Sequence, residues 1–348
     1  MTPFLLPVMA FSLLMGTLIT ITSSNWMLAW MGIEINTLAI IPLMIQNHHP
    51  RAAEATTKYF IVQAAAAAMI LFSAVVKAWL TGEWIINPFS EPFSTSLLIL
   101  ALALKLGLAP LHSWLPDVLQ GLDFTTGMIL STWQKIAPLT LMLQASKFEL
   151  PLVLTLGAVS VVVGGLGGLN QVQTRKIMAY SSIAHLGWMA VALPFAPHLT
   201  LMALTLYIIT TYCLFSILLL TGGKTINTLA ISWTKSNAIL ISTPILLFSL
   251  GGLPPTMGFV PKWFILSELT AHHMSTVALV IAMGSLLSLY FYIRLTYALT
   301  LTKAPNTITC LPTWRLQLSS WDTLLMTSVL LITLLMPASP AALALFMT

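Results

Sequence analysis

Long apolar runs recur along almost the whole of this 348-residue sequence. About eleven of them are long enough to cross the roughly 30 Å hydrocarbon core of a bilayer as a helix. They cover residues 3–22, 25–46, 57–80, 95–119, 124–143, 150–169, 177–194, 199–221, 238–268, 275–301 and 322–346. Because a backbone in lipid must satisfy its own hydrogen bonds, these runs predict an all-α polytopic membrane protein.

The composition supports a membrane protein and excludes several other classes. Of the residues, 58% are hydrophobic and 7% charged, whereas soluble domains carry roughly 25% charged residues. The net charge of +5 comes mostly from short loops, so we interpret it as a topology signal and expect no nucleic-acid partner. Two cysteines cannot supply the four thiolates of an iron–sulfur cluster. We find no Walker motif, and we interpret the glycine-rich run 164–168 as close helix packing.

Two of the apolar runs are interrupted by the same pattern of glycine and proline. Residues 107–117 read GLAPLHSWLPD and residues 252–262 read GLPPTMGFVPK, with Gly, Leu, Pro and Pro at the same four positions. Proline removes a backbone donor and clashes with the preceding turn, so both helices must be broken. Paired interruptions of this kind indicate an ion or substrate site in a transporter fold.

The two broken helices are separated by an odd number of spans and therefore run in opposite directions, which predicts an inverted repeat. We expect a first half over residues 1–145, broken near 107–117, and a second half over 146–303, broken near 251–262. A loop and a C-terminal helix would follow in 304–348.

Basic residues predict the orientation. If the chain starts on side A, this side receives Arg51, Lys58, Arg175, Lys176, Lys224, Lys235, Lys303 and Arg315, and side B keeps little more than Lys77 and Lys147. By the positive-inside rule, side A is the cytoplasm or its organellar equivalent, and the C-terminus lies on the opposite face. Lys77 and Lys147 lie near helix ends, from which lysines usually extend to the headgroups.

Ionisable residues deep inside the apolar runs are the candidate functional residues. They are Glu34, Lys105, Lys135, Lys262, His112 and His185. A lysine at the bilayer centre costs about 2.5 to 3.5 kcal/mol on insertion scales. Burial favours its neutral form and a nearby carboxylate favours its charged form, so such a lysine can bind and release a proton. In structural alternatives, Glu34 is only a counter-ion and His185 a hydrogen-bonded core histidine.

Several motifs together resemble the antiporter-like subunits of respiratory complex I, over essentially the whole chain. They are residues 30–36 (WMGIEIN), 105–112 (KLGLAPLH), 133–135 (WQK), 175–187 (RKIMAYSSIAHLG) and 251–263 (GGLPPTMGFVPKW). The resemblance implies a proton-pumping subunit of the membrane arm of an NADH:ubiquinone reductase. It further implies that Glu34 pairs with Lys105, that Lys135 continues the proton path and Lys262 completes it, and that His112 and His185 relay protons or hold water.

The same resemblance implies partners and a location. NADH, FMN, iron–sulfur clusters and ubiquinone would be bound by partner subunits, and this chain would bind no cofactor or metal. Other membrane-arm subunits, accessory subunits and lipid would surround it. The short N-terminal part resembles the animal mitochondrial form, which implies the inner membrane with side A, and hence the N-terminus, in the matrix and the C-terminus in the intermembrane space. A stand-alone cation/proton antiporter and a structural membrane spacer remain alternatives.

Overall fold

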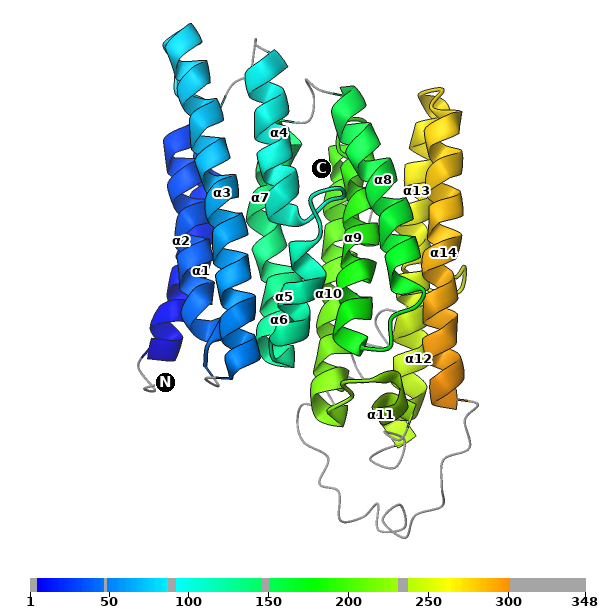
Figure 1. The fold of residues 1–348 in the computed structure, drawn as a ribbon. Helices are drawn as coiled ribbons and strands as arrows, with labels where there is room; N and C mark the ends of the chain where they lie inside the picture. The colour runs from blue at the N-terminus through cyan, green and yellow to red at the C-terminus, as the bar shows by residue number, and fades with distance from the viewer. Residues whose placement is uncertain (1–4, 47–48, 87–91, 146–149, 231–236, 301–348) are drawn as a thin grey trace. The chain divides into compact units, whose positions relative to one another are not determined.

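The computed structural model describes residues 5–46, 49–86, 92–145, 150–230 and 237–300 (Figure 1). Every regular element among these residues is a helix, as the apolar runs predict. The expected C-terminal segment 304–348, with its span 322–346, lies outside the described residues. So do Lys147, Lys235, Lys303 and Arg315.

The helices follow one another along the chain with short connections. Their bounds are α1 Leu5–Thr22, α2 Trp26–Met44, α3 Pro50–Thr81, α4 Pro92–Leu106, α5 Trp114–Gly121, α6 Phe124–Thr132, the 3₁₀ helix η1 Trp133–Lys135, α7 Ile136–Ala145, α8 Leu150–Gly168, α9 Thr174–Ala192, α10 Pro197–Thr221, α11 Ile226–Ala230, α12 Asn237–Gly251, α13 Phe259–Ala271 and α14 Ser275–Thr300. Five of the described helices, α2, α3, α8, α10 and α14, are each long and apolar enough to cross a membrane.

Three of the predicted runs are divided in the structure. The run 95–119 becomes α4 and α5, and the run 238–268 becomes α12 and α13, as the glycine–proline pattern predicts. The run 124–143 was expected to be continuous, but η1 separates α6 from α7. Pro138 explains this difference, because it has no N–H to donate to the carbonyl of Gln134, and a tighter 3₁₀ turn fits there.

The two glycine–proline breaks begin with the same local geometry, although the Ala109–Pro110 peptide bond is cis and the corresponding Pro254–Pro255 bond is not. Gly107 and Gly252 have φ angles of 81° and 78°, a left-handed conformation that glycine adopts without a steric penalty. After each glycine, the N–H of a leucine donates to a carbonyl five residues earlier, from Leu108 to Ala103 at 2.9 Å and from Leu253 to Phe248 at 3.2 Å. At the start of each break, the repeat seen in the sequence is therefore also a repeat in backbone structure.

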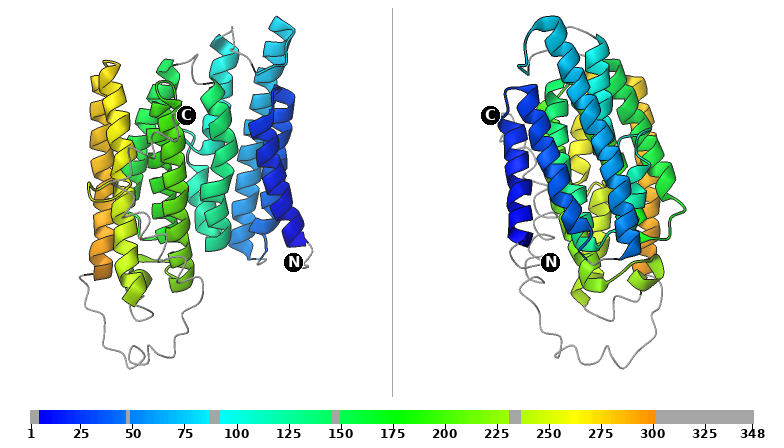
Figure 2. Two further views of the ribbon diagram at one scale, coloured as in Figure 1. Left: turned by 180° about the vertical axis from the view of Figure 1, so that it is seen from behind. Right: turned by 60° about the vertical axis from the view of Figure 1, so that its left-hand side comes forward.

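The helices form two compact units that divide between Ser160 and Val161. In the first unit, α1 packs on α2, and α3 packs on α2, α4 and α5 (Figure 2, right). Glycines allow α1 and α2 to approach closely: a β-carbon at Gly16 would lie 2.9 Å from the carbonyl oxygen of Gly32, and one at Gly32 would lie 2.9 Å from that of Gly16.

In the second unit, α12 packs against α10 and α14, and α13 packs against α9, α10 and α14. The irregular segment between α12 and α13 is visible from behind (Figure 2, left). The glycine-rich run packs as expected, since a β-carbon at Gly164 would lie 2.7 Å from the Ala184 nitrogen and one at Gly165 would lie 3.0 Å from the Gly284 carbonyl oxygen. These glycines bring α8 against α9 and α14.

Lys77 corrects one expectation. Its side chain does not extend to the headgroups but is buried, with 3% of the residue exposed, and Nζ donates to the carbonyl oxygen of Ile85 at 2.8 Å. The reason is that the segment after α3 turns back to the start of α2, where the Trp26 N–H donates to the Trp84 carbonyl. The lysine therefore bonds to the returning backbone.

Candidate functional site: two lysine-lined cavities

Lys105 and Lys135 line the same cavity in the first unit. Lys105 lies in the last turn of α4, directly before the break, and Lys135 ends η1; the two residues are 6% and 3% exposed. The space that the centre of a water molecule can reach in this cavity is about 20 Å³. Its other polar lining residues are Asn36, Thr37, Tyr59, Gln63 and Gln134. Two lysines that lie 30 positions apart in sequence thus share one polar space.

Glu34 lies near this cavity without lining it. It is half-buried in the middle of α2 and interacts electrostatically with Lys105. Its Oε2 and the Lys105 Nζ are both buried, and neither has a hydrogen-bond partner among the described residues. The expected pair therefore acts through space and not through a direct hydrogen bond.

Side-chain donors hold the broken end of α4. The last carbonyls of any helix have no partner within that helix. Here the Trp114 Nε1–H donates to the Leu104 carbonyl at 3.0 Å and the Gln63 amide donates to the Lys105 carbonyl at 3.4 Å. The Trp114 ring also packs edge-on against Tyr59, with centroids 5.8 Å apart. These contacts fix the backbone that carries Lys105.

Lys262 and His185 line a second cavity, which lies in the second unit. Lys262 follows the break in the first turn of α13, and His185 comes from the middle of α9. This cavity offers about 30 Å³ to the centre of a water molecule, and Tyr207, Thr210 and Ser249 are its other polar lining residues. The His185 ring lies 5.5 Å from the Tyr207 ring, centroid to centroid.

A helix end faces the charge of Lys262. Its Nζ donates to the carbonyl oxygen of Gly251 at 2.8 Å, and Gly251 is the last residue of α12. The carbonyl end of a helix carries a partial negative charge. The ring of Trp188 adds a cation–π contact at 5.9 Å from Nζ. The break therefore stabilises an ammonium group with backbone and aromatic groups.

His112 differs from the other candidates because it lines neither cavity. It is half-buried between α4 and α5, and its backbone carbonyl accepts a hydrogen bond of 3.0 Å from the Leu115 N–H. Of the six sequence candidates, Lys105 and Lys135 thus share the first cavity, and Lys262 and His185 share the second. Glu34 lies close to Lys105, and His112 lies outside both cavities.

Uncharged polar residues of both cavities were missed from the sequence. In the first unit these are Asn36, Tyr59, Gln63 and Gln134, and in the second unit Tyr207, Thr210 and Ser249. A usable signal did exist for Asn36, Gln63 and Gln134, since each is an amide inside a long apolar run. Burying such a group without a partner is costly.

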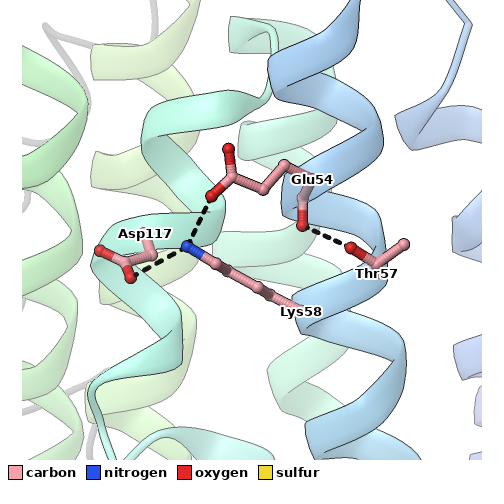
Figure 3. A network of polar contacts seen from close by, with 4 residues as sticks. All are labelled: Glu54, Thr57, Lys58 and Asp117. Atoms are coloured by element: carbon pink, nitrogen blue, oxygen red, sulfur yellow. Dashed lines mark hydrogen bonds and ion pairs between the residues drawn. The ribbon is translucent and has the colours of Figure 1, made fainter.

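Charged residues also meet at the surface of the first unit. Lys58 Nζ lies 2.8 Å from Glu54 Oε1 and 3.6 Å from Asp117 Oδ2 (Figure 3). The pair between Lys58 and Asp117 joins α3 to α5 beside the break, and the pair with Glu54 lies within α3. The three side chains are between 46% and 64% exposed, so water screens them and their contribution to stability is small.

The buried lysines of each unit can bind and release protons. A buried lysine with a polar cavity beside it can exist as ammonium or amine, since the surrounding groups decide which form is favoured. Each cavity exceeds the roughly 10 to 15 Å³ of such space that one water molecule requires. Lysine suits this exchange because arginine would stay protonated.

Comparisons with known proteins agree with this architecture. Residues 23–288 match the family model for the transmembrane part of NADH:quinone oxidoreductase and Mrp antiporter subunits. Residues 289–343 match the model for the C-terminus of NADH dehydrogenase subunit 2. The chain is 55% identical to NADH-ubiquinone oxidoreductase chain 2 of Tetraodon nigroviridis and 56% identical to that of Oncorhynchus mykiss, with 99% of each chain covered in both comparisons.

Solved structures share the fold. A chain of respiratory complex I from Thermus thermophilus superposes with a TM-score of 0.88 at 26% identity, covering 98% of this chain and 81% of that one. A chain of the Mrp complex from Dietzia sp. superposes with a TM-score of 0.84 at 15% identity, covering 95% and 74%. The second likeness concerns the fold alone.

Proposed function

Because the chain belongs to the NADH-ubiquinone oxidoreductase chain 2 family, we propose that it translocates protons as a membrane-arm subunit of respiratory complex I. It is part of an H⁺-translocating NADH:ubiquinone reductase and contributes no redox site of its own. It is an integral protein of the mitochondrial inner membrane, as its vertebrate relatives and apolar helices indicate.

The proposed mechanism rests on the cavity that Lys105 and Lys135 both line. Both lysines are buried, and a polar space large enough for water lies between the elements that hold them. A proton can therefore pass between lysine and cavity water with little movement of the backbone. Glu34 supplies the negative charge that favours the ammonium form of Lys105, and removal or approach of that charge shifts the balance.

In the second unit, Lys262 is the proton-binding group and His185 its neighbour across the cavity. Histidine is suited to relay protons near neutral pH. The Gly251 carbonyl and Trp188 favour the ammonium form of Lys262. His112 contributes a polar group at the first break, away from both cavities.

The wider organisation completes the proposal. The chain forms eleven spans with the inverted halves 1–145 and 146–303, and the matching backbone of the two breaks supports this repeat. The N-terminus lies in the matrix and the C-terminus in the intermembrane space, in keeping with the distribution of basic residues. Other membrane-arm subunits, accessory subunits and lipid cover its sides, and partner subunits bind NADH, FMN, the iron–sulfur clusters and ubiquinone.

The test is the proton uptake of sealed membranes per NADH oxidised, measured with assembled complex carrying Lys105→Met. We expect normal assembly and a lower proton yield or coupled turnover. A spacer would lose assembly or stability and keep the yield. A stand-alone antiporter would exchange sodium for protons as purified chain without NADH, and that result would replace the proposal.

A further inference from the structure

We propose that the side-chain amide of Asn36 binds a water molecule in the cavity of Lys105 and Lys135, and that Asn36 is thereby a positioning residue for proton exchange at these lysines. This rests on the proposed function of that cavity. It adds a residue that does not itself titrate but fixes the water with which the lysines exchange protons.

The amide of Asn36 is buried without a protein partner. Only 2% of the residue is exposed, and neither Nδ2 nor Oδ1 has a hydrogen-bond partner among the described residues. Nearly all buried polar side-chain atoms in proteins have a partner, either protein or ordered water. An amide with two unsatisfied atoms therefore points to a bound polar ligand.

The site is built around this amide. A β-carbon at Gly16 would overlap Asn36 Oδ1, so the glycine of α1 leaves room for the side chain of α2. On the other side, the Gln134 amide donates to the Asn36 backbone carbonyl at 3.2 Å, and Gln134 precedes Lys135. This bond fixes Asn36 to η1, the element that carries Lys135.

Water is the ligand that fits. The cavity offers about 20 Å³ to water centres, against the roughly 10 to 15 Å³ that one water needs, and a buried water needs two to four polar partners. Asn36 lines this cavity and supplies a buried donor, Nδ2, and Lys105 Nζ is a further buried group without a hydrogen-bond partner among the described residues. A metal cation is disfavoured, because two lysines line the same space.

The role of the bound water follows from proton chemistry. A lysine ammonium releases its proton to an acceptor within hydrogen-bond distance, and an amine takes one from a donor at the same distance. Asn36 holds the water by donating from Nδ2 to its oxygen, while Oδ1 packs against Gly16 of α1. Without the amide, the space is lined at this point by apolar surface and the water loses a fixed position.

The experiment compares three variants in the assembled complex. Asn36→Leu keeps the shape and removes both polar atoms, and Asn36→Ser retains a smaller polar group. Thr20→Val is the matched control, because Thr20 is a buried residue packed beside Gly32 and its hydroxyl donates to the Thr17 carbonyl of its own helix. Proton yield per NADH and coupled turnover are measured for each, with Lys105→Met in parallel.

We expect Asn36→Leu to lower coupled turnover about fivefold, as loss of one hydrogen bond on the path implies. Asn36→Ser should recover most of this loss, and Thr20→Val should match the wild type. If Asn36→Leu equals the wild type while Lys105→Met fails to pump, the role of Asn36 is wrong and the proposed function stands. If both equal the wild type, both are wrong.

If the complex with Asn36→Leu does not assemble, a second measurement tests whether Asn36 binds a water molecule. High-resolution density of the wild-type complex should show an ordered water within about 2.7 to 3.2 Å of the Asn36 amide. Density for that water supports the proposal, and a dry cavity at a resolution that shows waters elsewhere in the membrane domain overturns it.

Discussion

Lys262 donates a hydrogen bond of 2.8 Å from Nζ to the carbonyl oxygen of Gly251, so the lysine after the second break binds the helix end before it. The contact spans 11 positions in sequence and closes the irregular segment between α12 and α13. It gives Lys262 two tasks, since the same ammonium group that lines the cavity also satisfies a buried carbonyl.

Replacing Lys262 should separate these two tasks. Lys262→Met leaves the Gly251 carbonyl without its donor, which costs about 1 to 3 kcal/mol, and removes the proton-binding group. Lys262→Arg keeps a donor but stays protonated. We expect Lys262→Met to lower both the thermal stability of the complex and its proton yield. Lys262→Arg should lower mainly the proton yield. Stability is followed by thermal inactivation of the assembled complex; wild-type pumping by the Arg variant would contradict the proton-binding role.

Removing the charge of Glu34 should slow turnover. Glu34→Gln keeps the shape of the side chain but removes the negative charge that favours the ammonium form of Lys105. We expect slower NADH-coupled turnover in a complex that assembles normally. Glu54→Gln is the control, because this carboxylate is exposed and pairs with Lys58 at the surface. Equal turnover in the two variants would show that Glu34 has no special relation to Lys105.

Gly258 should tolerate no side chain. A β-carbon there would overlap the backbone carbonyl oxygen of Ser249, and backbone cannot turn away as a flexible side chain can. Gly258→Ala should therefore destabilise the second break by about 1 to 3 kcal/mol. Gly251→Ala is the comparison, since its β-carbon would approach no atom closer than 3.7 Å. The yield of assembled complex measures both, and equally good assembly would mean that the close contact is unimportant.

The breaks could be predicted because their cause is local. Proline and glycine act on the backbone within one or two turns, so the pattern at 107–117 and 252–262 predicts an interruption wherever the helices pack. The same local effect acts at Pro138, where it produces η1, which ends at Lys135. Depth in an apolar run also correctly predicted that Lys105, Lys135 and Lys262 are buried, but it missed Lys77.

The partners of the buried groups could not be predicted, because they depend on tertiary packing. Nothing near Lys262 in sequence indicates that Trp188 and His185 lie beside it. Lys77 also depends on tertiary packing. Its position near a helix end predicts a side chain that extends to the headgroups, but the segment after α3 returns and supplies the Ile85 carbonyl as its hydrogen-bond acceptor. His112 has a polar side chain beside a break, yet packing leaves it outside both cavities.

Proton exchange at Lys135 during turnover is tested most directly by the number of protons moved per NADH oxidised in sealed membranes with Lys135→Met. Lys135→Arg, which keeps a permanent positive charge, is measured beside it, and assembly is checked for both. We expect assembled complexes with reduced proton yield or coupled turnover in both variants. Wild-type values for an assembled Lys135→Met complex would contradict this expectation and make the central lysine a structural residue.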